Sequence, residues 1–94
     1  MDMSSFKESL SAEEPPQNVT VYLNALWYDA TGDWDKAHTL IQDINDRDAS
    51  WIHAYLHRKE GDTGNAGYWY SRAGKQMPYL TLEKEWEQIA TALL

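Results

Sequence analysis

The sequence predicts an all-α fold, and three observations support this prediction. Apolar residues recur at helical spacing in several segments, a glycine–aspartate pair interrupts the chain twice, and no segment alternates like a β-strand. The chain has 94 residues, 43% of them hydrophobic, which is the size of one small domain with a single core. We therefore expect one helical domain without β-structure.

Residues 1–17 are expected to form an N-terminal arm, partly ordered or folded as a short helix. Ser5 lies three residues before Glu8, which is the spacing of a capping box. Pro15 and Pro16 then break any helix and favour an extended connection. A single all-α, repeat-like domain is expected over residues 18–94.

A first helical hairpin is predicted directly after this arm. Asn18 is expected to cap a helix whose apolar face is Val19, Tyr22, Leu23, Leu26, Trp27 and Ala30. Gly32 can adopt the left-handed conformation that closes a helix, and Asp33 can cap the next one. The second helix carries its apolar residues at Trp34, Ala37, Ile41 and Ile44.

A second hairpin is predicted after a polar connector over residues 45–50. A helix is expected over residues 51–60, and Gly61 and Asp62 then repeat the turn. The following helix is expected to run toward Met77, where Pro78 prevents its continuation.

A last helix from about Thr81 is expected to cover the two hairpins. Its apolar stripe is Leu82, Trp86, Ile89, Ala90 and Leu93, and we expect Glu83, Glu85 and Glu87 to point outward. Small residues of the preceding helix are expected to give it close packing: Gly67, Ser71 and Gly74.

The two hairpins are related by an internal repeat, because four identities share an offset of 29 positions (54 minus 25, for example). The pairs are Ala25 and Ala54, Gly32 and Gly61, Asp33 and Asp62, and Ala37 and Ala66. Over roughly residues 19–78 this pattern resembles a tetratricopeptide repeat, although that family steps by about 34 residues. The resemblance implies two tetratricopeptide-like hairpins plus a C-terminal capping helix.

The run HAYLHRKEGD, followed by NA and YWYSRAG, more narrowly resembles a small family of uncharacterised tetratricopeptide-like proteins. This resemblance implies a shared fold and site, and it implies no reaction. By analogy with the repeat family, we expect a protein-interaction module. Its partner would be another protein, a peptide, or a second copy of this chain bound through the apolar end at residues 92–94.

The alternative function is a small-ligand or divalent-metal site, conceivably enzymatic. His53, His57 and Glu60 follow the i, i+4, i+7 spacing of one helix face, and His38 on the preceding helix can add a nitrogen. The simpler interpretation is that both histidines are interface residues bonded to the preceding helix, particularly to Gln42. The sequence identifies no catalytic residue, no metal ligand set and no cofactor.

A second candidate constellation lies on the helix after Asp62. Asn65, Trp69 and Arg72 share a stripe with Gln76, suited to a peptide carboxylate or a phosphorylated ligand. Alternatively, Trp69 covers the hairpin while Arg72 pairs with Glu60 or Asp62. Arg58 joins the candidates as part of the densest positive charge, although a solvated edge that pairs with Glu60 and nearby acids is the simpler interpretation. The candidate ligand-binding residues are His38, His53, His57, Arg58, Glu60, Asn65, Trp69 and Arg72.

The charge and cysteine content restrict the partners and the compartment. A net charge of -7 argues against nucleic acid and anionic membranes as partners. Zero cysteines argue against a disulfide framework, and the first residues lack the pattern of a signal peptide. We therefore expect a cytoplasmic protein.

Overall fold

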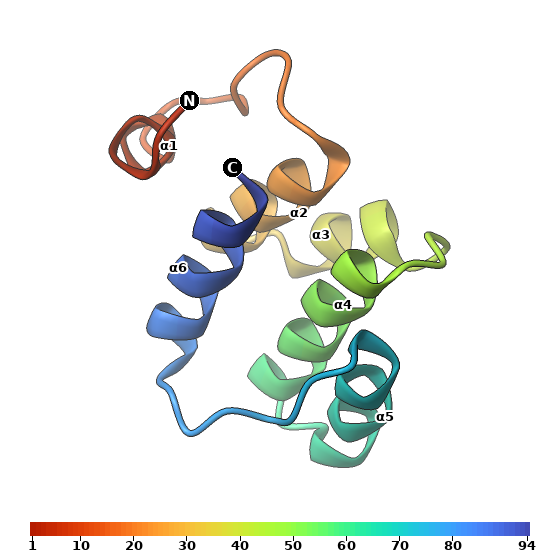
Figure 1. The fold of residues 1–94 in the computed structure, drawn as a ribbon. Coiled ribbons are helices and arrows are strands. Elements are labelled where there is room, and N and C mark those ends of the chain that lie inside the picture. Colours follow the sequence, from red (N-terminus) through yellow and green to blue (C-terminus); the bar gives the residue numbers. More distant parts are fainter.

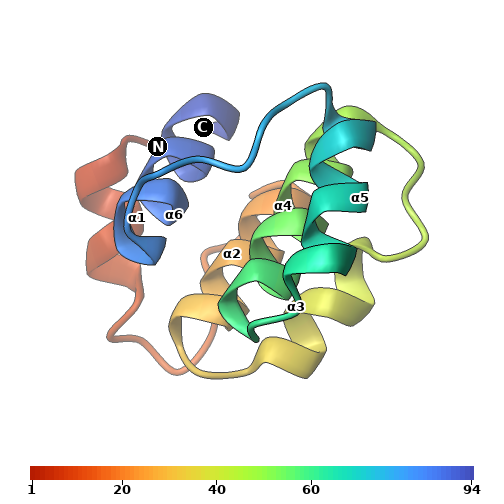
Figure 2. The ribbon, with the colours of Figure 1, turned by 90° about the horizontal axis from the view of Figure 1, so that it is seen from below.

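The computed structural model describes all 94 residues, Met1–Leu94, and confirms the all-α fold. Six helices and no strand are present: α1 (Met3–Ser9), α2 (Val21–Ala30), α3 (Trp34–Ile41), α4 (Arg47–Lys59), α5 (Thr63–Ala73) and α6 (Leu82–Leu93). Helices α1 and α6 lie on one side and α3 and α5 on the other, with α2 and α4 between them (Figure 1 and Figure 2). No helix combines the length and the apolar character needed to cross a lipid bilayer.

The core includes residues of the N-terminal arm. Phe6 on α1 is completely buried and stacks on Trp86 of α6, with 5.7 Å between ring centroids. Asp2 caps α1 by accepting a hydrogen bond from the Ser5 amide at 2.8 Å, so the predicted capping box at Ser5 is wrong. Burial of Phe6 makes α1 a wall of the same core that the later helices build.

The cap of α2 also differs from the prediction. Thr20, rather than Asn18, caps this helix and accepts a hydrogen bond from the Leu23 amide at 3.3 Å. Asn18 instead takes a left-handed conformation, with a φ angle of 64°. Asparagine tolerates this conformation better than most residues, so Asn18 turns the chain into the helix instead of capping it.

The two glycine–aspartate turns have the same structure, as the internal repeat predicts. Gly32 and Gly61 have φ angles of 96° and 87°. The Asp33 amide donates to the Tyr28 carbonyl at 2.8 Å, and 29 positions later (57 minus 28) the Asp62 amide donates to the His57 carbonyl at 2.9 Å. Each aspartate side chain caps the helix that follows. The four repeated alanines are completely buried: Ala25, Ala37, Ala54 and Ala66.

Three predicted helix boundaries are wrong. Helix α4 starts at Arg47 because Asp46 caps it, accepting from the Ala49 amide at 2.8 Å, so residues 47–50 are helix and not connector. Helix α3 stops at Ile41, before Ile44. Helix α5 stops at Ala73 because Gly74, with a φ angle of 73°, ends it well before Pro78.

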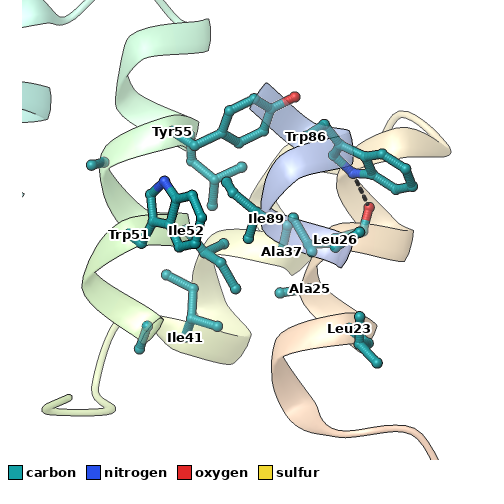
Figure 3. Close-up of a cluster of buried hydrophobic side chains, with 14 of the residues drawn as sticks. Leu23, Ala25, Leu26, Ala37, Ile41, Trp51, Ile52, Tyr55, Trp86 and Ile89 are labelled. Carbon is teal, nitrogen blue, oxygen red and sulfur yellow. Dashed lines mark hydrogen bonds between the residues drawn. The ribbon is translucent and has the colours of Figure 1, made fainter. Parts of the chain in front are cut away.

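Helix α6 begins after the Thr81 cap, as predicted, but packs against α2 and α4 and not on the small residues of α5. Its Trp86 indole donates to the Leu26 carbonyl at 3.0 Å, and Ile89 is completely buried in the core (Figure 3). The space between α2 and α4 buries these large side chains, whereas Gly67 on α5 is exposed. The expected packing through Gly67, Ser71 and Gly74 is therefore wrong.

Candidate functional site

Three histidine side chains meet where α3, α4 and α5 come together. His53 and His57 lie one turn apart on α4 and are only 6% and 7% exposed, because α3 and α5 cover that side of the helix. His38 of α3 brings its Nε2 atom to 3.0 Å from Nε2 of His53. Each of the three residues offers a nitrogen atom within 4.8 Å of the other two.

Two indole rings hold this histidine cluster in place. Trp34 stacks on His38 with 4.9 Å between centroids and 9° between planes. Trp69 stacks on His53 with 3.9 Å between centroids and 16° between planes. Trp34 is itself fixed, because its indole donates to the Leu56 carbonyl at 2.9 Å. The stacking restricts the imidazole rings to orientations in which their nitrogens face one another.

His57 is oriented by a carboxylate and an amide. Its Nδ1 atom lies 2.6 Å from Oε1 of Glu60, and its Nε2 atom lies 3.4 Å from the Asn65 amide nitrogen. A carboxylate accepts hydrogen bonds, so Nδ1 carries the proton and Nε2 keeps its lone pair. Glu60 therefore fixes the tautomer of His57 as a second-sphere carboxylate does at a metal-bound histidine.

Burial favours the uncharged form of His38 and His53. Burial lowers the pKa of His53 to about 4, and repulsion from His38 and His57 adds to this effect. The pKa of His38 is lowered for the same reasons, burial first and His57 second. Both side chains are neutral near pH 7, which is the form that binds a metal ion.

The spacing of the nitrogens suits a tetrahedral metal ion. Zinc binds imidazole nitrogen at about 2.0–2.1 Å, which places two tetrahedral ligands roughly 3.3 Å apart. The Nε2 atoms of His38 and His53 are 3.0 Å apart, where one of them must donate a proton to the other. A shift of that proton to Nδ1 of the same ring leaves a lone pair on each of the two facing Nε2 atoms. With His57 the cluster offers three nitrogen ligands and leaves a fourth position open.

Arg72 borders the cluster without joining it. Its guanidinium lies 5.1 Å from the Trp69 ring centroid and donates to Oδ1 of Asn45 at 2.6 Å. The predicted pairing with Glu60 or Asp62 is therefore wrong. Gln76 lies beyond the end of α5 and so leaves the predicted stripe. Gln42 is exposed and makes no hydrogen bond to a histidine. His38 is instead the hydrogen-bond partner of His53.

Arg58 lies on the opposite side of α4 and takes no part in the histidine cluster. It donates to Oε1 of Glu85 at 2.9 Å and to the Leu80 carbonyl. Only 18% of its side chain is exposed, so the solvated edge considered for Arg58 is also wrong. The other candidate residues do gather at the cluster or its border: His38, His53, His57, Glu60, Asn65, Trp69 and Arg72.

Glu85 was expected to point outward, but it lies in the core. It is completely buried, and it accepts hydrogen bonds from the Trp51 indole at 3.3 Å and from the Tyr70 hydroxyl at 2.6 Å in addition to Arg58. A signal was present, because Glu85 lies three residues after Leu82 and four before Ile89. That spacing puts it on the apolar stripe itself.

The phenol next to Glu85 is held in its neutral form. Burial raises the pKa of Tyr70, and the hydrogen bond to the Glu85 carboxylate raises it further. Tyr70 therefore remains a hydrogen-bond donor well above neutral pH. With Arg58 and Trp51, it supplies the donors that let a carboxylate be buried.

Comparisons with models of protein families, with curated proteins and with solved structures give no significant match to this chain. Function must therefore be inferred from the residues and their geometry.

Proposed function

We propose that this chain binds a divalent transition-metal ion, zinc foremost, through His38, His53 and His57. The observation that carries the proposal is the convergence of three imidazole nitrogens within 4.8 Å of one another. Imidazole suits zinc, copper and nickel, whereas magnesium and manganese prefer oxygen ligands. Three protein ligands with one open position is the arrangement of zinc sites that also bind water or a small ligand.

The second-sphere contacts add support. The Glu60 carboxylate holds the proton on Nδ1 of His57, so Nε2 keeps its lone pair, and a metal ion there would replace the long contact to the Asn65 amide. Trp34 and Trp69 each cover one face of an imidazole ring, that of His38 and that of His53. Asp62 belongs to a second group of ligand atoms, with His57 and Glu60. Both acidic residues there are exposed, so the three-histidine group is the better site.

The tetratricopeptide-like interaction module stays a prediction with weaker support. Large exposed hydrophobic side chains are few: Met1, Tyr68, Tyr79 and Leu94. Tyr68 alone stands beside polar binding groups, because Arg72 donates to its hydroxyl at 3.2 Å. A cytoplasmic location also stays a prediction, supported by the absence of cysteine.

Thermal unfolding with a panel of metal ions tests the metal site. The protein is first stripped with a chelator and then heated with zinc, nickel, cobalt, manganese or magnesium. Zinc at a hundredfold excess over its Kd adds about 2.7 kcal/mol, which raises Tm by roughly 10 °C or more in a domain of this size. Magnesium is expected to leave Tm unchanged, since hard cations bind imidazole poorly.

Two variants, one within α3 and one at its C-cap, serve as a matched pair in this experiment. His38→Ala removes one ligand and is expected to abolish most of the zinc shift, whereas Gln42→Ala changes an exposed residue one turn later and is expected to retain it. Glu60→Gln should weaken zinc binding by about 10- to 100-fold. The proposal is wrong if no metal ion raises Tm, or if His38→Ala responds to zinc as the unmodified chain does.

A further inference from the structure

A cavity of about 440 Å³ lies between α1, α2, α4 and α6, on the side of the molecule away from the histidines. Its apolar wall includes Leu10, Leu82 and Trp86. The volume lies within the range of about 300–1,000 Å³ that small-molecule sites occupy. The cavity can therefore take the apolar body of a small molecule, and the charges around it determine which head group fits.

The inner wall of the cavity offers no unpaired charge. Asp29 is 2% exposed, and its Oδ1 atom accepts a hydrogen bond from Nζ of Lys59 at 2.9 Å. Tyr55 reaches from α4 toward α6 (Figure 3). Burial raises the pKa of Tyr55, and the charge of Asp29 and a hydrogen bond to it raise this pKa further, so the phenol is uncharged. A ligand therefore finds an inner wall without net charge.

The mouth of the cavity carries one carboxylate without a partner. Glu83 and Glu87 lie one turn apart on α6, and both line the cavity. Glu87 pairs with Lys7 across the gap between α1 and α6. Glu83 is exposed and takes part in no ion pair. Since Asp29 pairs with Lys59, the unpaired charge of the lining is the negative charge of Glu83.

A cationic head group fits this arrangement better than a neutral or an anionic one. An amphipathic cation can bury its apolar chain while its charged head stays in water, as lysine side chains do at protein surfaces. The head then keeps most of its hydration and is attracted by Glu83. An anion would be repelled by Glu83 and would find both ammonium groups of the lining already paired.

We propose that this cavity binds a small amphipathic cation, of the class of primary alkyl amines. Its apolar chain lies against Leu10, Leu82 and Trp86, and its ammonium group lies at the mouth beside the Glu83 carboxylate. This site is separate from the histidine cluster and does not depend on metal binding.

Nuclear magnetic resonance titration of the full chain at neutral pH tests the proposal with hexylamine, which is protonated there as a lysine side chain is. Saturable shifts are expected for the Trp86 indole and for the methyl groups of Leu10 and Leu82. Hexanol and hexanoate carry the same apolar chain with a neutral or a negative head. Hexanol should bind at least about threefold more weakly, and hexanoate at least about fivefold. Absence of saturable shifts with hexylamine would overturn the proposal, as would equal or tighter binding of either analogue.

Two glutamate-to-glutamine substitutions provide the matched control, because each removes one negative charge from an exposed side chain. Glu83→Gln is expected to weaken hexylamine binding at least about threefold and to leave hexanol binding unchanged. Glu8→Gln lies on α1 outside the lining of the cavity and should change hexylamine binding by less than about twofold. Equal effects of the two substitutions on hexylamine would contradict the role of Glu83.

Discussion

The two sides of α4 bury polar clusters of opposite character. Toward α3 and α5, His53 and His57 join His38 in a cluster of imidazole rings stacked on indoles. Toward α6, Arg58 joins Glu85 in a cluster around one buried carboxylate. Both clusters are buried polar groups in the same small core, and both come from the same helix.

The clusters differ in how completely their hydrogen bonds are satisfied. Glu85 accepts from three side chains, so every group there has a partner within the protein. In the histidine cluster His38 and His53 share one proton between two facing nitrogens, and the Asn65 contact at 3.4 Å is long. The saturated cluster leaves no acceptor for a ligand, whereas the histidine cluster keeps nitrogen lone pairs that the proposed metal ion would use.

Removal of the buried carboxylate is expected to have the largest effect. Glu85→Ala leaves Arg58, Tyr70 and Trp51 without their acceptor and should lower the free energy of unfolding by about 3–5 kcal/mol. Glu83→Ala, an exposed change on the same helix, should stay within about 0.5 kcal/mol. Urea unfolding followed by circular dichroism measures both.

His38→Ala in the metal-free chain is expected to lower the free energy of unfolding less than Glu85→Ala does. His38 is only partly buried, so its loss should cost roughly 1 kcal/mol. Equal destabilisation by His38→Ala and Glu85→Ala would break the distinction between the two clusters.

A smaller effect is expected at alkaline pH, on the carboxylate side alone. The folded-state pKa of Tyr70 is raised above its unfolded value of about 10, so the unfolded chain loses the phenolic proton first. Stability is therefore present below about pH 10 and falls as pH rises, by about 1.4 kcal/mol from Tyr70 at pH 11. Tyr70→Phe lacks this loss.

Urea unfolding of both chains near pH 8 and pH 11 measures this difference. Near pH 8 the variant should be less stable by about 1.5–3 kcal/mol, because the hydrogen bond to the carboxylate is gone. The gap should narrow by about 1.4 kcal/mol at the higher pH. A gap that stays constant would show that Tyr70 ionises as readily in the folded chain as in the unfolded one.

Local signals in the sequence predicted most of the fold. Each Gly–Asp pair specifies a helix stop and the next helix start, and both turns form as predicted at Gly32 and Gly61. The predicted helix ends were wrong where another capping residue comes earlier in the chain. Asp46 caps the start of α4, and Gly74 ends α5 before Pro78 is reached. Single residues decide such ends, so helical periodicity alone could not locate them.

The residues of the candidate site could be predicted from the sequence, but the side of α4 on which each of them lies could not. The repeat placed His38 beside His53, and the i, i+4 spacing aligned His57 with it. Nothing local indicated that Arg58 would turn toward α6, because its partner Glu85 is 27 positions away (85 minus 58). Residues far apart in the chain set that direction, and only the packed structure contains that information.

X-ray absorption at the zinc edge measures which ligands surround a bound zinc ion. Protein loaded with one equivalent of zinc and passed through a desalting column is predicted to show three imidazole nitrogens at about 2.0–2.1 Å and one oxygen ligand. His38→Ala should reduce the imidazole count to two. Zinc that washes away, or a coordination shell of oxygen atoms that His38→Ala leaves unchanged, would contradict a three-histidine metal site.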